Sequence, residues 1–182
     1  TNVGLNPTRT GVIEILQRMG ASIDIDARHT DAGEPVGKLT VEPAPLQGID
    51  IPPELVPLAI DEFPAIFVAA ACAHGETVLR GAEELRVKES DRIAVMAEGL
   101  ARLGIEVHPQ PDGIRIVGGQ LRGGHVEAHG DHRIAMSFAM AALAADGPVT
   151  IDDCAEVDTS FPGFVELAHR AGLAIRAEET AA

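Results

Sequence analysis

A short segment at residues 86–92, Arg-Val-Lys-Glu-Ser-Asp-Arg, concentrates side chains that can bind anions or move protons. Six of its seven residues are charged or carry a hydroxyl group. The apolar residues that follow recur at three- and four-residue steps, which predicts that the segment forms the first turns of an amphipathic helix. On such a helix Lys88 and Arg92 share a face and repel each other, and the helix dipole disfavours cations near the amino end. We therefore expect an anion to bind there.

Two further polar clusters stand at the starts of predicted apolar helices. Asp61 and Glu62 precede Pro64, a residue suited to the first helical position, and Gly-Asp-His-Arg occupies residues 130–133. An arginine that opens an almost wholly apolar helix is half-buried, so Arg133 needs an anionic partner. The aspartates of both clusters have a plainer interpretation as well, because an aspartate at a helix start acts as an N-cap or a favourable dipole charge worth ~1 kcal/mol. The sequence leaves both interpretations open.

Two other polar residues carry weaker signals. A lone histidine such as His132 is more often a structural hydrogen-bonding group than a catalytic one. Arg9 lies in Asn-Pro-Thr-Arg-Thr (residues 6–10) at another helix start, and we predict that it is structural or exposed to solvent.

The elements that must position these residues are repeated along the chain. One unit is an amphipathic helix that ends at a glycine and continues as a strand, and it occurs in 15–25, 100–107 and 167–176. The glycine would be the left-handed C-cap of each helix. The other unit is an alanine-rich helix, a glycine and a strand, and it occurs in 64–80 and 134–151. A third copy of this unit would precede Thr1, so we expect the chain to begin within a repeat.

These patterns predict an α/β fold of three pseudo-equivalent units, in which buried alanine-rich helices pack against small mixed sheets. Short strands are expected at 38–41, 114–117, 125–128 and 173–176, with a hairpin turn at Asp112-Gly113. We assign residues 1–176 to a single domain and 177–182 to a frayed tail. Because equivalent helix starts lie at the same end of the domain, the cations should converge there with Asp61 and Glu89. Such a site suits a substrate with phosphate and carboxylate groups, with one carboxylate taking a proton and the other giving one.

Composition excludes several other classes of protein. A net charge of -14 argues against nucleic acid as a partner, whereas three of the 14 Lys and Arg residues lie in segment 86–92. Cys72 and Cys154 are too few for a disulfide framework, so a reducing compartment such as the cytoplasm is expected. No run of residues has the length and apolarity of a membrane span or signal peptide. No P-loop, metal cluster or Ser-His-Asp spacing competes with the anion site.

Three motifs together resemble the C-terminal part of the EPSP synthase (3-phosphoshikimate 1-carboxyvinyltransferase) family: Leu-Arg-Val-Lys-Glu-Ser-Asp-Arg at 85–92, Asp-His-Arg-Ile-Ala-Met at 131–136 and Thr-Ser-Phe-Pro-Gly-Phe at 159–164. The resemblance extends from Asn6 to Gly172. It implies one of two domains of an enzyme, each a pseudo-threefold assembly of βαβαββ units, an inside-out α/β barrel with buried helices. The implied reaction transfers the enolpyruvyl group of phosphoenolpyruvate to the 5-hydroxyl of shikimate 3-phosphate and releases phosphate, in the shikimate pathway to aromatic amino acids. The resemblance implies no metal or organic cofactor, and a cytoplasmic, monomeric full enzyme.

The resemblance also implies roles for matching residues. Asp61 resembles the carboxylate that accepts a proton from the shikimate hydroxyl, and Glu89 resembles the group that protonates the methylene carbon of phosphoenolpyruvate. Lys88 resembles the lysine at the substrate hydroxyl. Arg92 and Arg133 resemble two arginines that clamp phosphoenolpyruvate and hold the competing herbicide glyphosate. Supporting roles fall to the other members of the motifs: Asp131, His132, Arg86 and Asp91.

One position departs from the pattern, because many members carry a lysine where this chain has Thr159, and a threonine cannot replace a cation on the leaving phosphate. The sequences of residues 60–64 and 158–162 resemble those of the bacterial class of this enzyme with reduced glyphosate sensitivity. The residues that usually decide this sensitivity lie outside this chain. Because the family's first domain supplies most contacts to the shikimate phosphate, we expect this chain to be inactive alone.

Two alternatives stay open at the level of sequence. A UDP-N-acetylglucosamine enolpyruvyl transferase would share the fold and a related reaction, but the wording of residues 131–133 fits that enzyme poorly. A non-catalytic binding domain built from the same repeat would use the charged residues only as surface ion pairs, which contribute little to stability.

Overall fold

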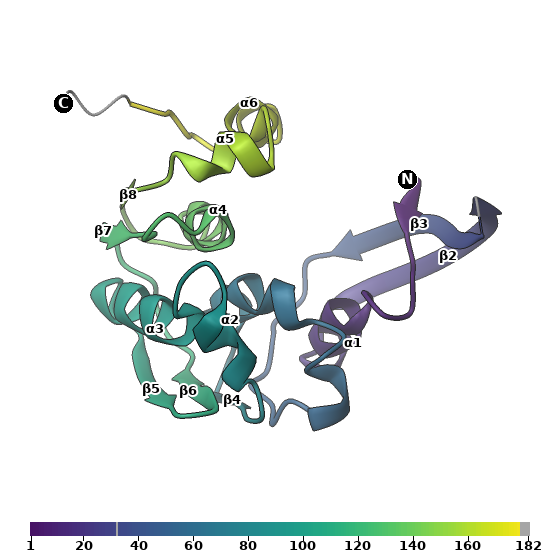
Figure 1. Ribbon diagram of the computed structural model, residues 1–182, viewed down its shortest axis with the longest axis horizontal. Helices are drawn as coiled ribbons and strands as arrows, with labels where there is room; N and C mark the ends of the chain where they lie inside the picture. The colour runs from purple at the N-terminus through teal and green to yellow at the C-terminus, as the bar shows by residue number, and fades with distance from the viewer. Residues whose placement is uncertain (32, 179–182) are drawn as a thin grey trace.

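The computed structural model describes residues 1–31 and 33–178, and they form an α/β fold. Of the predicted tail, Ala177 and Glu178 are exposed and have no regular secondary structure, and residues 179–182 lie outside the described part. Figure 1 shows the β2–β3 hairpin extending to the right, and the α4, α5 and α6 helices stacked above α2 and α3.

The described strands form three small sheets. In the first, β3 (Glu34–Glu42) pairs with β1 (Val3–Gly4) and β2 (Ser22–Asp31), all antiparallel. In the second, β6 (Gly113–Val117) lies between β4 (Glu76–Leu79) and β5 (Glu106–Gln110), again antiparallel. In the third, β7 (Gly124–Glu127) and β8 (Val149–Asp152) are parallel.

Most strand predictions are confirmed, including the hairpin at Asp112-Gly113. Mixed sheets were expected, but each described sheet is wholly antiparallel or wholly parallel. Isolated parallel bridges join Gln47 to His74 and Asp50 to Val78. The strand predicted at 173–176 is absent, since these residues have no regular structure and no described strand pairs with them. A strand needs the hydrogen bonds of a neighbour, which the apolar pattern of its own residues cannot supply.

The helices differ in burial as the repeat predicts. The described α-helices are α1 (Gly11–Arg18), α2 (Phe63–Ala71), α3 (Arg92–Arg102), α4 (His132–Ala141), α5 (Glu156–Ser160) and α6 (Phe164–Arg170), with 3₁₀ turns η1 (Pro53–Leu55), η2 (Ile60–Glu62) and η3 (Glu83–Val87). The alanine-rich α2 and α4 are buried on most sides, whereas α1 and α3 bury one face. The glycines that end the three amphipathic repeats are left-handed, as predicted: Gly20, Gly104 and Gly172.

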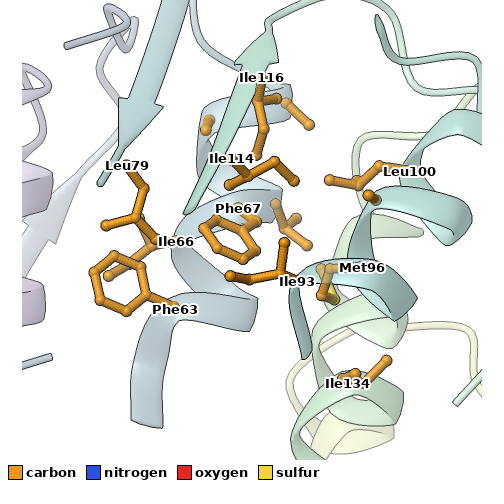
Figure 2. Packing of buried hydrophobic residues seen from close by; sticks show 14 of the residues in the cluster. Phe63, Ile66, Phe67, Leu79, Ile93, Met96, Leu100, Ile114, Ile116 and Ile134 are labelled. Atoms are coloured by element: carbon orange, nitrogen blue, oxygen red, sulfur yellow. The ribbon is translucent and has the colours of Figure 1, made fainter. Parts of the chain in front are cut away.

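The main core lies between α2, α3, α4 and the second sheet. Figure 2 shows Phe63 and Phe67 of α2 facing strand residues and α3, where Ile93 and Met96 are fully buried. Gly99 brings α3 close to α4, because a Cβ atom there would lie 2.1 Å from the Phe138 ring. This close packing fixes the starts of α3 and α4 relative to each other.

The start of α3 differs from the prediction. Residues 83–87 form the separate turn η3, Lys88 is extended, and the helix begins only at Arg92. Asp91 caps it by accepting a hydrogen bond from the backbone N–H of Ala94 at 2.9 Å. Aspartate is among the strongest N-cap residues, so Asp91 sets the first helical residue at Arg92. The apolar periodicity alone had predicted a helix that begins several residues earlier. Lys88 and Arg92 therefore do not share a helix face.

Candidate active site

Asp61 lies at the centre of five charged residues that the structure brings together from separate elements. It is held in η2, and Lys88 and Glu89 follow η3, while Arg92 and Arg133 lie in the first turns of α3 and α4. The Asp61 carboxylate lies 3.5 Å from the Lys88 ammonium, 3.6 Å from the Arg92 guanidinium and 3.9 Å from that of Arg133. We call Asp61, Lys88, Glu89, Arg92 and Arg133 the charged cluster.

The surroundings of Asp61 favour its ionised form. Burial raises the pKa of Asp61, but the charges of Arg133, Lys88 and Arg9 outweigh burial and leave the pKa lowered. Asp61 does not act as an N-cap, because no side-chain hydrogen bond caps η2 or α2. The N-cap interpretation of this aspartate is therefore wrong, but its place in the first turn of η2 still fits a favourable helix-dipole charge. Its carboxylate faces the neighbouring cations.

Asp131 accepts hydrogen bonds from the first turns of both α3 and α4. It is completely buried and accepts a hydrogen bond from Arg92 Nε at 2.8 Å, with a further bond from the Ser90 hydroxyl at 3.1 Å. Its second oxygen accepts from the backbone N–H groups of Arg133 and Ile134, at 3.0 and 3.4 Å, so Asp131 is also the N-cap of α4. Burial raises the pKa of Asp131, but hydrogen bonds and charge from Arg92 outweigh burial and lower it. For Asp131 the N-cap interpretation is confirmed.

Arg92 lies under the surface of the cluster. Its side chain is 1% exposed, and its Nη2 donates to the Glu89 carboxylate at 2.6 Å. Its buried Nη1 has no hydrogen-bond partner among the described residues, and the 3.6 Å ion pair with Asp61 is its compensation. An anion reaches this nitrogen only where Asp61 or Glu89 gives way. Glu89 is half exposed, so its side chain has room to move.

Lys88 and Arg133 lie nearer to solvent than Arg92. The Lys88 ammonium donates to the Glu84 carboxylate at 2.5 Å, and this hydrogen bond is the main reason that the pKa of Lys88 is raised. The Arg133 side chain is 32% exposed and donates to the backbone carbonyl of Asp61 at 3.2 Å. Both side chains are partly exposed, so a ligand can reach them.

A hollow of about 180 Å³ adjoins the cluster. Arg133 and Asp61 line one part of it, and the remaining lining comes from the starts of α2 and α4: Glu62, Pro64, Ala65, Met136, Ser137 and Met140. His132 is half-buried at the start of α4, is not part of this lining, and has no side-chain hydrogen bond to another described residue. Thr159 is exposed on α5 and has no described hydrogen bond or ion pair with the cluster.

Three residues near the cluster were not predicted to belong to it. Arg9 is exposed, as its sequence context indicated, and its guanidinium also donates to the Asp61 carboxylate at 3.4 Å. Glu84 and Ser90 hold Lys88 and Asp131. The signal that could have found Arg9 is its place at the start of α1, because equivalent helix starts were expected at one end of the domain.

Arg86 and Asp91 are local supports, as expected. They form an ion pair at 2.7 Å, and Arg86 also donates to the backbone carbonyls of Gln110 and Pro111. Among the described residues, no three His, Cys, Asp or Glu side chains gather closely enough to hold a metal ion. None of the described helices has the length and apolarity needed to cross a membrane.

A family model described as EPSP synthase (3-phosphoshikimate 1-carboxyvinyltransferase) matches residues 1–167. The chain belongs to the EPSP synthase family. Curated relatives named 3-phosphoshikimate 1-carboxyvinyltransferase include that of Nitrosococcus oceani, which is 66% identical over 175 residues, and that of Alkalilimnicola ehrlichii, which is 65% identical over 175 residues. Both matches cover 96% of this chain but only 39% of the relative, so the chain spans well under half of their length.

Solved structures of EPSP synthases share the fold. The EPSP synthase from Acinetobacter baumannii superposes with a TM-score of 0.94 at 55% identity, covering 97% of this chain and 42% of that one. The enolpyruvyl transferase NikO from Streptomyces tendae has a TM-score of 0.70 at 23% identity over 92% of this chain and 36% of its own, which shows a common fold alone. The predicted EPSP synthase-like α/β fold is therefore confirmed.

Proposed function

We propose that this chain forms one side of the active site of a 3-phosphoshikimate 1-carboxyvinyltransferase. Such an enzyme transfers the enolpyruvyl group of phosphoenolpyruvate to the 5-hydroxyl of shikimate 3-phosphate and releases phosphate. The observation that carries this proposal is the charged cluster, in which three cations surround Asp61 within 4 Å while Glu89 stays half exposed. The names of the relatives support the same reaction.

The geometry suits addition of the hydroxyl to phosphoenolpyruvate. Asp61 accepts the proton of the attacking hydroxyl, and Lys88, 3.5 Å away, stabilises the negative charge that develops on its oxygen. Glu89 gives a proton to the methylene carbon as the new carbon–oxygen bond forms. The Glu89 carboxylate then takes a proton back from the new methyl group as the carbon–oxygen bond to phosphate breaks, which restores the enolpyruvyl double bond and releases phosphate.

The arginines would bind the anionic groups of phosphoenolpyruvate. Arg133 is accessible at the hollow, whereas Arg92 is covered by Asp61 and Glu89. Because Glu89 is half exposed, its carboxylate returns to water when it leaves Arg92, and a ligand carboxylate in its place would keep the buried guanidinium paired. This exchange would release the Glu89 carboxyl next to the ligand, where a proton donor is required.

The rest of the site would come from the part of the enzyme that this chain does not include. We propose that this part forms a second domain, supplies most contacts to the shikimate phosphate, and closes on residues 1–176 when substrate binds. The full enzyme is expected to be a cytoplasmic monomer without nucleic-acid or membrane partners. The family match favours this reaction over transfer to UDP-N-acetylglucosamine, and a non-catalytic domain would have no need of a buried arginine between three carboxylates.

Substitution of Glu89 in a complete enzyme tests the proposal. A chimera in which this chain replaces the matching segment of the Nitrosococcus oceani relative provides that enzyme. Glu89→Gln removes the proton donor but keeps the shape, so phosphate release from the two substrates should fall by about 10²–10⁴-fold. The matched control is Glu98→Gln on α3, whose carboxylate pairs with Arg102 at the surface and should not affect turnover.

Thermal unfolding of both variants separates catalysis from folding. The proposal requires that Glu89→Gln unfolds within a few degrees of the parent while losing turnover. A chimera that folds but releases no phosphate contradicts the proposed reaction, and so does a Glu89→Gln variant with the turnover of the control.

A further inference from the structure

We propose that Arg9 is a positioning residue for Asp61, held against the charged cluster by the loop that precedes α1. The inference rests on the proposed function, in which Asp61 accepts a proton from the substrate hydroxyl. Arg9 donates from Nη1 to Asp61 Oδ2 at 3.4 Å across a separation of 52 residues. No role is implied for this arginine by the motifs at 85–92, 131–136 and 159–164.

The loop that carries Arg9 is held by its own hydrogen bonds. The Asn6 side-chain oxygen accepts from the backbone N–H of Thr8 at 3.0 Å and from the Thr8 hydroxyl at 2.8 Å. The Asn6 carbonyl accepts from the Arg9 backbone N–H at 2.9 Å, and the Asn6 amide donates to Glu34 on β3 at 3.0 Å. The backbone of Arg9 is therefore fixed in one place, so only its side chain has to be ordered to reach Asp61.

A close backbone contact joins the same loop to the segment that carries Asp61. The Gly11 N–H donates to the Leu58 carbonyl at 3.2 Å, three residues before Asp61. A Cβ atom at Gly11 would lie 2.7 Å from the Leu58 carbonyl carbon, closer than side chains pack, so only glycine permits this approach. The backbones that carry Arg9 and Asp61 are thus coupled near both residues.

The two oxygens of Asp61 have different neighbours. Lys88 and Arg92 approach Oδ1 at 3.5 and 3.6 Å, whereas Arg9 approaches Oδ2, where the other cation, Arg133, is 3.9 Å away. Without Arg9, Oδ2 keeps only the longer contact and the carboxylate is free to rotate. Arg9 therefore fixes which oxygen faces Lys88, the residue beside the proposed reacting hydroxyl.

The charge of Arg9 also favours the ionised form of Asp61. Burial raises the pKa of Asp61, and Arg9 is one of three cations that together lower it, after Arg133 and Lys88. A base that has been protonated cannot accept a proton, so activity falls as the pH drops through the pKa of Asp61. Removal of Arg9 should raise this pKa, and the loss of activity in acid should then begin at a higher pH.

The test compares three variants of the chimera with the Nitrosococcus oceani relative. Arg9→Gln removes the charge, Arg9→Lys keeps it, and Arg18→Gln is the control, because Arg18 lies on α1 and pairs only with Glu14 among the described residues. We expect Arg9→Gln to lower kcat by about two- to fivefold, in keeping with one partly exposed ion pair, with KM for both substrates nearly unchanged. The acid limb of the kcat profile should move to higher pH, Arg9→Lys should restore most of the loss, and Arg18→Gln should match the parent.

Several results would overturn the inference. An acid limb that stays in place in Arg9→Gln contradicts it, as does a rise in KM with kcat intact, which would make Arg9 a substrate ligand. A loss that Arg9→Lys does not restore also counts against it. If the parent chimera has no turnover, the proposed reaction fails, but NMR titration of the Asp61 carboxyl in the parent and in Arg9→Gln still decides the role of Arg9. An identical titration in the two proteins would refute that role.

Discussion

At the scale of single residues, Asp131 shows how one carboxylate both caps a helix and pairs with a buried arginine. One oxygen caps α4 and the other holds Arg92, the largest fully buried side chain of the described core. A buried guanidinium is stable only with a paired, hydrogen-bonded partner. Sequence spacing left the cap and the binding role as alternatives, whereas the structure shows the two hydrogen-bonding tasks on the same side chain.

Replacement of Asp131 by asparagine should therefore be costly. Asparagine still caps a helix, so Asp131→Asn removes mainly the charge opposite Arg92, and we expect a loss of about 3 kcal/mol in the free energy of unfolding. Asp91→Asn is the matched control, because Asp91 also caps a helix and pairs with an arginine, but at the surface, where the expected loss is about 1 kcal/mol or less. Urea denaturation of the two variants measures both values, and equal losses would contradict the assigned role of the buried pair.

The same carboxylates predict how stability depends on pH. The pKa values of Asp61 and Asp131 in the folded protein lie below their ordinary value of 3.8. The unfolded chain therefore binds protons first, so their contribution is complete above that value and is lost as the pH falls through the lower folded pKa values. Urea midpoints should drop steeply below about pH 4 in the parent and less steeply in Asp131→Asn. A parent whose midpoint is constant between pH 5 and pH 2 would contradict this expectation.

At the scale of elements, local patterns predicted the helices and most strands but not how their ends are built. The alanine-rich and amphipathic periods located α1 to α4, and the left-handed glycines marked where the amphipathic helices end. The start of α3 was placed too early, because the apolar period cannot show that Asp91 caps the helix. The strand at 173–176 was wrong because pairing is a property of two segments.

The candidate site was partly predictable for the same reason. Lys88, Glu89 and Arg92 are close in sequence, and the repeat brought Asp61 and Arg133 into the same region. Arg9 was missed, since nothing within its own loop indicates an acidic partner 52 residues away. The burial of Arg92 beneath Glu89 was also not predictable, because it depends on how closely α3 packs against α4.

The close approach of α3 and α4 can be tested at Gly99. Alanine in place of glycine inside a helix usually stabilises it by about 1 kcal/mol. Here the new methyl group would meet the buried Phe138 ring, so we expect Gly99→Ala to destabilise the fold by about 1–3 kcal/mol. In a Phe138→Leu background, where the ring is gone, Gly99→Ala should destabilise the fold less than it does in the parent. Calorimetric unfolding measures this, and a stabilising Gly99→Ala would show that the contact does not restrict the helices.

At the scale of the whole molecule, cations gather at one site of a chain that is acidic overall. The chain carries a net charge of -14, yet the charged cluster and Arg9 place four cations around one carboxylate. Small anionic ligands respond to this local arrangement, whereas a nucleic acid would respond to a broad basic surface. The cluster lies partly open, next to a hollow of about 180 Å³. A hollow of this size is small for the two substrates of the proposed reaction, which agrees with the proposal that another part of the enzyme completes the site.

At the same scale, we propose that this chain supplies one side of a site that the remainder of the enzyme completes. The most direct measurement is the rate of phosphate release from phosphoenolpyruvate and shikimate 3-phosphate, compared between this chain alone and the chimera with the Nitrosococcus oceani relative. The account predicts turnover in the chimera and none above background in the chain alone. Turnover by the chain alone within about tenfold of the chimera, a difference of only about 1.4 kcal/mol in activation free energy, would contradict it.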